Sequence, residues 1–388
     1  MQIKPTRILE ALDTLGHIGY KSGIGTSRVA YSAAFNEGRN FVKQYMEEVG
    51  LETYIDGVGN LTGRLCGPGS IIAIGSHIDT VPGGGKYDGV YGVLAGVEVL
   101  RTLKESGYQN KHAIEVIAFN EEEGNAVGGT FGSKAFAGQA QEGSAIEKLP
   151  KFNMTVDNIN SSRRCPSDYH CYLEWHIEQG GVLEKLQKDV GIVEGIVGIA
   201  RYNITVHGAA NHAGTTPMDL RDDALKKACA VFLRAIEICR SVDKSMVCTA
   251  GYMNVFPGAV NVIPGKVEFP LEFRTLNMKN IELAVYQLQE EFAEISINNF
   301  LWQEATIMDE HLMGIISDCC KNRGLSVNNM PSGAGHDAIN MALFTPTAML
   351  FIPSVGGISH SPREFSKEAD IIHGAELLLD TVVQIDKE

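Results

Sequence analysis

Two short apolar runs, residues 70–75 and 113–119, flank a segment, residues 90–100, whose apolar side chains recur at helical spacing. Apolar runs of this length without alternation are typical of strands that are buried on both faces. A strand, a helix and a second strand in this order favour a parallel pair of strands. Further strand-like runs occur at residues 171–177 and 347–353. The sequence therefore predicts an α/β fold with a mostly parallel sheet.

The pattern changes after Gly195. Apolar and polar residues alternate over residues 199–206, and two strongly helical segments and two more strand-like segments follow before α/β character returns near Asp309. This order is typical of a small α+β domain with helices on one face of an antiparallel sheet. We therefore predict a discontinuous domain, residues 1–197 and 308–388, and an inserted domain, residues 198–307.

The charge balance excludes some classes of partner. The chain has 33 Lys and Arg against 47 Asp and Glu, which gives a formal net charge of −14. A surface that binds nucleic acid or an anionic membrane would need a basic stripe, and the sequence has no dense basic block. The apolar runs are shorter than the ~20 residues of a membrane span, and no signal peptide is visible at the start. Eight cysteines without a Cys-x-x-Cys pair predict free thiols and a cytoplasmic location.

Several common catalytic motifs are missing from the sequence. It contains no P-loop, no G-x-G-x-x-G, no G-x-S-x-G and no H-E-x-x-H. The segment 333–338 fits only a looser dinucleotide pattern and follows a polar stretch, not a clear strand. Kinase, nicotinamide-enzyme, serine-hydrolase and zincin functions therefore lose their usual support.

Histidines and carboxylates instead gather where apolar strands end. His77, residues 121–123 and His176 follow or close three predicted strands, Asp88 precedes a helix, and His360 follows the last strand. Each has an ordinary structural explanation when taken alone. In an open α/β sheet, however, the carboxyl ends of the strands meet at one crevice. Imidazoles and carboxylates together are ligands for transition metals, so the pattern predicts a dinuclear metal site.

Nine short segments in order then show a family resemblance. The sequence resembles the group of N-carbamoyl-L-amino-acid hydrolases, allantoate amidohydrolases and β-ureidopropionases, within the dinuclear aminoacylase and carboxypeptidase superfamily. The segments that carry the resemblance are 27–32, 57–60, 75–96 (GSHIDTVPGGGKYDGVYGVLAG), 119–124 (FNEEEG), 176–180 (HIEQG), 211–218 (NHAGTTPM), 261–265 (NVIPG), 332–338 (SGAGHDA) and 356–362 (GGISHSP).

The resemblance implies a set of metal ligands. The catalytic domain would be a phosphorylase/hydrolase-like α/β domain with two divalent ions per subunit, which are Zn, Mn, Co or Ni. Asp88 would bridge the two ions. His77 and His176 would complete the protein ligands of one ion, and Glu123 and His360 those of the other.

The resemblance also implies two residues that act beside these ligands. Asp79 would orient the imidazole of His77, as the outer partners of metal-binding histidines do. Glu122 would be the general base, because its neighbour Glu123 is occupied as a ligand. The run of three glutamates leaves this register open, although counting from Phe119 and from Gly124 gives the same assignment.

The inserted domain resembles a ferredoxin-like lid and dimerisation domain. The resemblance implies a homodimer in which His212 reaches the active site of the partner subunit and stabilises the oxyanion. The other residues implied to contact the substrate are Gln179 at the ureido group, Asn261 and Arg274 at the carboxylate, and Gly356 and Gly357 through their backbone.

The implied activity is hydrolysis of the carbamoyl C–N bond of a ureido acid, by a metal-bound hydroxide with Glu122 as base. The substrate would be an N-carbamoyl-L-amino acid, allantoate or a related ureido acid, so the enzyme would act on C–N bonds other than peptide bonds. Ala126 and Val127 replace an Arg-Phe pair that is common in relatives, which leaves the substrate open. An aminoacylase or dipeptidase on the same scaffold, and a non-catalytic binding protein, are the alternatives. The roles of His336 and Asp337 also stay open.

Overall fold

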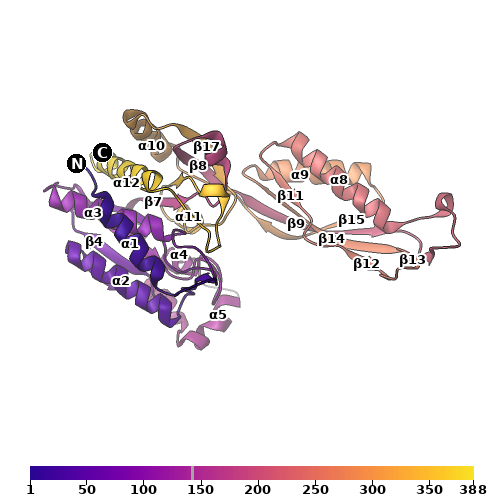
Figure 1. Ribbon diagram of the computed structural model, residues 1–388, viewed down its shortest axis with the longest axis horizontal. Coiled ribbons are helices and arrows are strands. Elements are labelled where there is room, and N and C mark those ends of the chain that lie inside the picture. The colour runs from indigo at the N-terminus through magenta and orange to yellow at the C-terminus, as the bar shows by residue number, and fades with distance from the viewer. Residues whose placement is uncertain (141–143) are drawn as a thin grey trace. The chain divides into compact units, whose positions relative to one another are not determined.

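The computed structural model describes residues 1–140 and 144–388, and the chain forms two compact units (Figure 1). The larger unit consists of Met1–Glu194 and Met308–Glu388, and the smaller unit of Gly195–Ile307. The smaller unit is thus an uninterrupted stretch of chain inserted into the larger one.

A mixed sheet forms the centre of the larger unit. Its strands are β3 (Glu52–Ile55), β4 (Leu61–Leu65), β5 (Gly69–His77), β6 (His112–Phe119), β7 (Tyr169–Ile177), β8 (Val190–Ile196), β17 (Val327–Ser332) and β18 (Thr347–Ile352). They pair in the order β8-β18-β7-β5-β6-β4-β3, and β17 also pairs with β8.

The strand directions correct the prediction of a mostly parallel sheet. The four central strands β18, β7, β5 and β6 are parallel to their neighbours in this group. Strand β8 on one side and strands β4 and β3 on the other run antiparallel. The edge differs because residues 52–65 fold as a hairpin, in which Gly59 has a φ of 98°, and this hairpin adds to β6 in the antiparallel sense.

Five helices share one hydrophobic core with one face of this sheet. Ile74 of β5 and Trp175 of β7 lie in that core, and both side chains are fully buried. Because successive side chains of a strand point to opposite faces, His77 and His176 belong to the other face. The five helices are α1 (Pro5–His17), α2 (Ala33–Val49), α3 (Val90–Glu105), α10 (Glu310–Arg323) and α12 (Glu368–Ile385).

Short elements accompany the other parts of the larger unit. A small hairpin follows α1, and α11 contacts both β7 and β18. The elements are β1 (Tyr20–Lys21), β2 (Gly25–Thr26), α4 (Phe131–Phe136), α5 (Ser144–Lys148), α6 (Val156–Ser162), α7 (Val182–Leu186) and α11 (Ala338–Met341), with 3-10 turns η1 (Leu149–Phe152), η2 (Pro166–Asp168) and η4 (Val355–Gly357).

The smaller unit is an antiparallel sheet with two helices packed into one core with it. Burial alternates along its two long strands, as expected of a sheet that covers a core with one face only. The sheet order is β11-β14-β9-β15, with β12 beside β14, and β10 pairs separately with β13. In chain order the elements are β9 (Gly198–His207), β10 (Asn211–His212), η3 (Met218–Leu220), α8 (Ala224–Val242), β11 (Val247–Thr249), β12 (Asn254–Phe256), β13 (Val262–Ile263), β14 (Lys266–Thr275), α9 (Met278–Glu291), β15 (Ser296–Gln303) and β16 (Thr306–Ile307).

Two further expectations can be compared with the structure. All eight cysteines are free thiols, as predicted. Among the described residues, no helix combines the length and the apolar character that a bilayer crossing requires.

Candidate metal centre

The first part of the site is the end of β5. His77 is the last residue of the strand, and its ring is almost fully buried. The ring nitrogen Nδ1 lies 3.0 Å from the backbone carbonyl of Asp79, which favours a proton on Nδ1 and a lone pair on Nε2. Burial lowers the pKa of His77 to about 4, so the imidazole is neutral at physiological pH. A neutral imidazole with a free Nε2 is a metal ligand.

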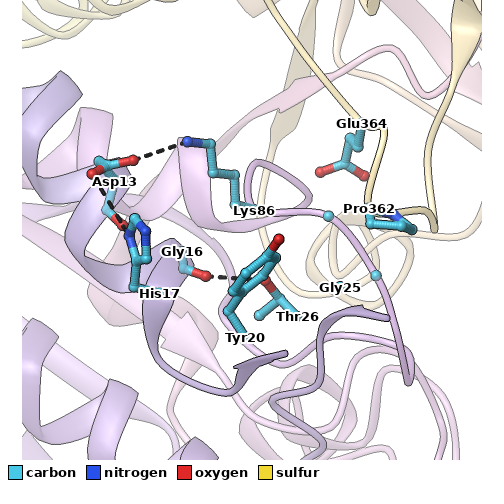
Figure 2. A pocket seen from close by; sticks show the side chains of 11 residues that line it. Asp13, Gly16, His17, Tyr20, Gly25, Thr26, Lys86, Pro362 and Glu364 are labelled. Atoms are coloured by element: carbon cyan, nitrogen blue, oxygen red, sulfur yellow. Dashed lines mark hydrogen bonds and ion pairs between the residues drawn. The ribbon is translucent and has the colours of Figure 1, made fainter. Parts of the chain in front are cut away.

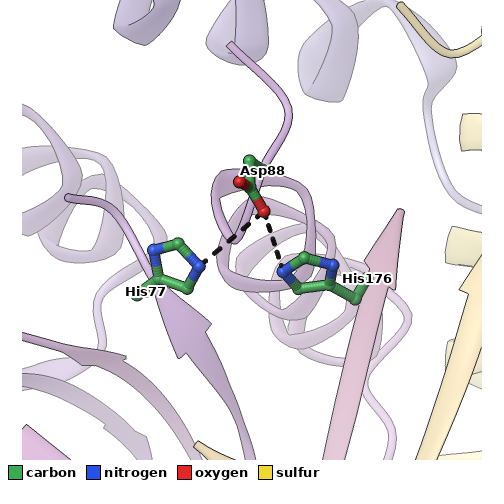
Figure 3. A group of neighbouring side chains, drawn as sticks. All are labelled: His77, Asp88 and His176. Carbon is green, nitrogen blue, oxygen red and sulfur yellow. Dashed lines mark ion pairs between the residues drawn. The ribbon is translucent and has the colours of Figure 1, made fainter. Parts of the chain in front are cut away.

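Asp88 lies at the start of α3 and faces three histidines. Its Oδ1 is 3.2 Å from Nε2 of His176 and 3.9 Å from Nε2 of His77 (Figure 3). Its other oxygen, Oδ2, is 3.1 Å from Nε2 of His360. The carboxylate therefore stands between two sets of imidazoles, as a bridging ligand would.

A tight turn gives Asp88 this orientation. The N–H of Val90 donates to the carbonyl of Asp88 at 2.7 Å, which closes a γ-turn with Gly89 at its centre. Gly89 has φ 67° and ψ −44°, a conformation that residues with a Cβ rarely adopt. A Cβ at this position would also overlap the ring of His77. Only glycine allows Asp88 and His77 to approach each other here.

The three glutamates follow β6 and have different environments. Glu121 is fully buried, and its Oε1 accepts the backbone N–H groups of the loop residues 126–128. Oε2 of Glu122 lies 3.8 Å from Nε2 of His77, and Oε2 of Glu123 lies 3.4 Å from Nε2 of His360. The structure thus brings Glu122 and Glu123 into the cluster, whereas Glu121 organises the loop that follows.

The side chain of Asp79 holds this glutamate turn. Its two oxygens accept the backbone N–H groups of Glu122 at 3.3 Å and of Glu123 at 3.1 Å. The side-chain oxygen Oδ1 is 3.7 Å from Nδ1 of His77, so the backbone carbonyl of Asp79 makes the shorter contact with the ring. Asp79 therefore links the end of β5 to the glutamate turn.

The remaining predicted residues of the larger unit lie at the ends of β7 and η4. His176 turns Nδ1 toward the carbonyl of Ile177 at 2.8 Å, and its Nε2 accepts the N–H of Gly89 at 3.1 Å. Gln179 donates from Nε2 to both oxygens of Asp88, at 3.0 and 3.1 Å. His360 is half exposed, and its hydrogen bond to Asp88 raises its pKa to about 9.

Gly356 and Gly357 approach the chain near Gly181. A Cβ at Gly357 would lie 2.7 Å from the backbone nitrogen of Gly181, so this contact requires glycine. The N–H of Gly356 already donates to Glu184 at 2.8 Å. Both glycines have a φ of 64°.

The donor set fits divalent metal ions. Among the residues that the structure describes, three groups of side chains have ligand atoms within 4.8 Å of one another, and two of them, His77–Asp88–His176 and Asp88–Glu123–His360, share Asp88. Burial and neighbouring carboxylates raise the pKa of Glu122 well above its usual value and that of Glu123 to about 8. Full ionisation of both glutamates is therefore unfavourable without compensating positive charge, which bound cations would supply.

Three predicted residues lie in the smaller unit. His212 belongs to β10, which pairs with β13 beside Asn261, and the N–H of Ala213 donates to the carbonyl of Asn261 at 2.9 Å. Nδ1 of His212 accepts the N–H groups of Gly214 and Thr215, which places the ring proton on Nε2. Arg274 lies on β14, away from these two strands in the sheet pairing, and its Nε donates to Glu272 at 2.8 Å.

Comparison with known proteins identifies the family. The sequence profile described as peptidase family M20/M25/M40 matches residues 73–384, which include every proposed metal ligand. The chain belongs to this family. This match, together with the relatives described next, confirms the resemblance drawn from the short segments.

Relatives match this M20 protein from end to end. It is 36% identical to the N-carbamoyl-L-amino acid amidohydrolase of Geobacillus stearothermophilus, over 99% of both chains. It is 34% identical to the allantoate amidohydrolase of Escherichia coli K12, over 97% of both chains. Among solved structures, an amidase of the hydantoinase/carbamoylase family from Burkholderia multivorans superposes with a TM-score of 0.89 and 30% identity, over 100% of this chain and 99% of the other.

The sequence did not predict some buried residues that hydrogen-bond the backbone next to the site. Asn60 is buried, accepts the N–H of Asn120 at 2.9 Å and donates to the carbonyl of Gly132 at 3.0 Å. The segment 57–60 carried part of the family resemblance, but nothing in it indicated this contact. His336 and Asp337, whose roles the sequence left open, are both buried in this M20 protein. The His336 ring packs against the ring of His176, and Asp337 accepts a hydrogen bond from a serine hydroxyl.

Proposed function

We propose that this M20 protein is a metal-dependent amidohydrolase that cleaves the carbamoyl C–N bond of an N-carbamoyl-L-amino acid, allantoate or a related ureido acid. The observation that carries the proposal is the position of Asp88, which contacts His77 and His176 through one oxygen and His360 through the other. End-to-end relatives named for hydrolysis of these two substrate types support the choice of substrate class.

The ligand assignment has two metal positions. His77, Asp88 and His176 would hold one ion, and Asp88, Glu123 and His360 the other, with zinc, manganese, cobalt and nickel as the candidates. When bound, the ions would supply Lewis acidity, which polarises a carbonyl group and favours the ionisation of water. The two positions are distinct because the two oxygens of Asp88 face different histidines.

Glu122 would move the proton. Its carboxylate is only 10% exposed and makes no metal contact in the assignment above. As base, it takes a proton from the water that attacks the carbamoyl carbon, and it then gives that proton to the leaving nitrogen as the C–N bond breaks. The products are the free amine and carbamic acid, which decomposes to ammonia and carbon dioxide. Burial raises the pKa of Glu122, which makes the carboxylate a stronger base.

The remaining residues would bind substrate. Gln179 would contact the ureido group, and Arg274 with Asn261 would bind the carboxylate, Arg274 through two parallel hydrogen bonds. Gly356 and Gly357 would offer backbone close to the substrate. We further propose that the protein is a cytoplasmic homodimer whose smaller unit is the lid and dimerisation domain, with His212 as the donor that stabilises the oxyanion.

Ammonia release from a substrate panel tests the function. Protein reconstituted with Mn²⁺ or Co²⁺ is given allantoate, N-carbamoyl-L-amino acids and N-carbamoyl-β-alanine, with N-acetyl amino acids and dipeptides as comparison substrates. The proposal requires ammonia from at least one ureido acid. Cleavage of only the N-acetyl compounds or dipeptides would instead support the aminoacylase or dipeptidase alternative on the same site.

Two neighbouring substitutions test the role of Glu122. Glu122→Gln should lower kcat by at least about 100-fold, the lower range for a general base, while Mn²⁺ affinity stays near the wild-type value. Glu121→Gln is the matched control, because an amide oxygen can still accept the three backbone N–H groups that Glu121 now binds. Full activity of Glu122→Gln with metal bound would show that another group is the base.

A further inference from the structure

A buried carboxylate beside the metal centre has no part in the function described so far. Glu364 is 5% exposed and lies four residues after His360. Its Oε1 accepts the backbone N–H groups of Tyr87 at 2.9 Å and of Asp88 at 3.1 Å. Its Oε2 accepts the hydroxyl of Ser359 at 2.8 Å. One carboxylate therefore connects the segments that carry Asp88 and His360.

We propose that Glu364 is a positioning residue, which holds Asp88 and His360 in the register that metal binding requires. Asp88 and His360 contact each other at 3.1 Å although they lie far apart in the chain. Glu364 binds the backbone N–H of Asp88 itself and the hydroxyl of Ser359, the residue before His360. Loss of these hydrogen bonds would let the two segments separate, and the ligand atoms of the second metal position would no longer converge.

The sequence of the Asp88 segment supports this role. Residues 83–85 are three consecutive glycines, and the segment lies outside the helices and strands that flank it. Gly85 has no positive φ, so its backbone conformation does not require glycine. A Cβ at Gly85 would, however, overlap the carboxyl group of Glu364. Gly85 therefore provides the space through which the carboxylate reaches the backbone.

A cavity lies beside this segment, and Glu364 is one of the residues that line it. The cavity has a volume of about 310 Å³ and is lined by Gly84, Gly85 and Lys86 of the segment. Figure 2 shows Glu364 and Pro362 on one side of the cavity, and the ion pair of Lys86 with Asp13, whose atoms are 3.0 Å apart, on the other. An exposed ion pair of this kind adds at most about 1 kcal/mol. Gly84 is also held, by two backbone hydrogen bonds with Thr26 at 2.8 and 3.0 Å, and the contacts with Glu364 fix the part of the segment at Tyr87 and Asp88.

The experiment measures Mn²⁺ binding by calorimetry, and it rests on the metal centre proposed above. Glu364→Met keeps a similar volume but removes both acceptors, and it should weaken Mn²⁺ binding by about 10–100-fold, the usual effect of losing an outer partner of a metal ligand. Glu364→Gln should restore binding to within about threefold of wild type. Its amide oxygen can accept both backbone N–H groups while its NH₂ donates to the Ser359 hydroxyl.

Asp386→Leu is the matched control. Asp386 is 1% exposed and also binds two backbone N–H groups, of Lys111 and His112, and one hydroxyl, of Tyr108. Asp386→Leu removes these three hydrogen bonds and should lower the melting temperature of the metal-free protein as much as Glu364→Met does. It should leave the Mn²⁺ affinity unchanged. A metal-specific effect therefore separates positioning from general destabilisation.

Three outcomes would overturn the inference. They are wild-type Mn²⁺ affinity in Glu364→Met, equal weakening by Glu364→Met and Glu364→Gln, and equal weakening by Asp386→Leu. If the wild-type protein itself binds no Mn²⁺, the proposed metal centre fails first, and the inference fails with it. Should Glu364→Met not fold, Gly85→Ala tests the same contact, because the added Cβ displaces the carboxylate. Wild-type affinity in Gly85→Ala would then contradict the proposal.

Discussion

Substitution of Gly89 by alanine should damage the proposed metal centre more than its small size suggests. Gly89 is at the centre of the γ-turn that orients Asp88, with φ 67° and ψ −44°. An alanine at this position lowers the stability of the fold in two ways. An alanine with positive φ costs about 1–2 kcal/mol in backbone strain. The new methyl group would overlap the buried His77 ring, and overpacking of this kind costs about 1–3 kcal/mol.

The expected loss in the free energy of unfolding is therefore about 2–5 kcal/mol. Domains are usually stable by about 5–15 kcal/mol, so the variant should still fold. Its Mn²⁺ affinity should fall by more than about 100-fold, because a ligand is displaced and not only an outer partner of one. Urea unfolding of the metal-free protein gives the first quantity, and calorimetric titration with Mn²⁺ gives the second.

Gly107→Ala is the matched control for this prediction. Gly107 has nearly the same φ, 68°, but a Cβ there would meet no atom within 4 Å. The free energy of unfolding of Gly107→Ala should fall only by the backbone strain of about 1–2 kcal/mol, and its Mn²⁺ affinity should equal that of wild type. The reasoning would be refuted if the two variants lost equal stability, or if Gly89→Ala kept wild-type Mn²⁺ affinity.

Three other outcomes are expected. Asn60→Ala leaves the buried N–H of Asn120 without an acceptor and should cost about 1–3 kcal/mol in urea unfolding, with a lower kcat; an unchanged midpoint would contradict this. Burial alone would raise the pKa of Asp243, but hydrogen bonds from Ser245 and Thr275 lower it to about 2. The ionised Asp243 carboxylate therefore stabilises the folded protein fully above the unfolded pKa of 3.8, and this stabilisation is lost as pH falls through 2. We expect Asp243→Asn to be less stable than wild type at pH 6 and equally stable below pH 2. Mn²⁺ at 100 times its Kd should stabilise the protein by about 2.7 kcal/mol for each ion bound, which a melting series with and without chelator measures.

The centre of the fold was predictable because its strands are apolar on both faces. Residues 70–75, 113–119, 171–177 and 347–353 include the cores of β5, β6, β7 and β18, which form the parallel centre of the sheet. The antiparallel edge was not predictable in the same way. Within residues 51–65, Gly57 and Gly59 indicate that the chain deviates but not that it reverses into a hairpin.

The site was predictable in its side chains but not in its main-chain contacts. Histidine and carboxylate at strand ends indicate ligands because the residue types themselves carry the chemistry. Backbone donors and acceptors occur at every residue, so no pattern indicates which of them Asp79 or Glu364 will bind. The contact of Asp79 with the glutamate turn and that of Glu364 with the Asp88 segment therefore required coordinates.

The insertion of the smaller unit has a consequence for how the chain is made. Strand β18 pairs with β7, so that Thr347 lies beside Tyr172, and all of residues 195–307 are synthesised between the two. The smaller unit is continuous and can fold during this interval, since its strands β9 to β15 pair among themselves. Strand β7 meanwhile exposes an unpaired apolar edge, which at about 5–20 residues per second lasts on the order of ten seconds or more. The nascent chain is thus most prone to aggregate, and most dependent on chaperones, while the inserted unit is being translated.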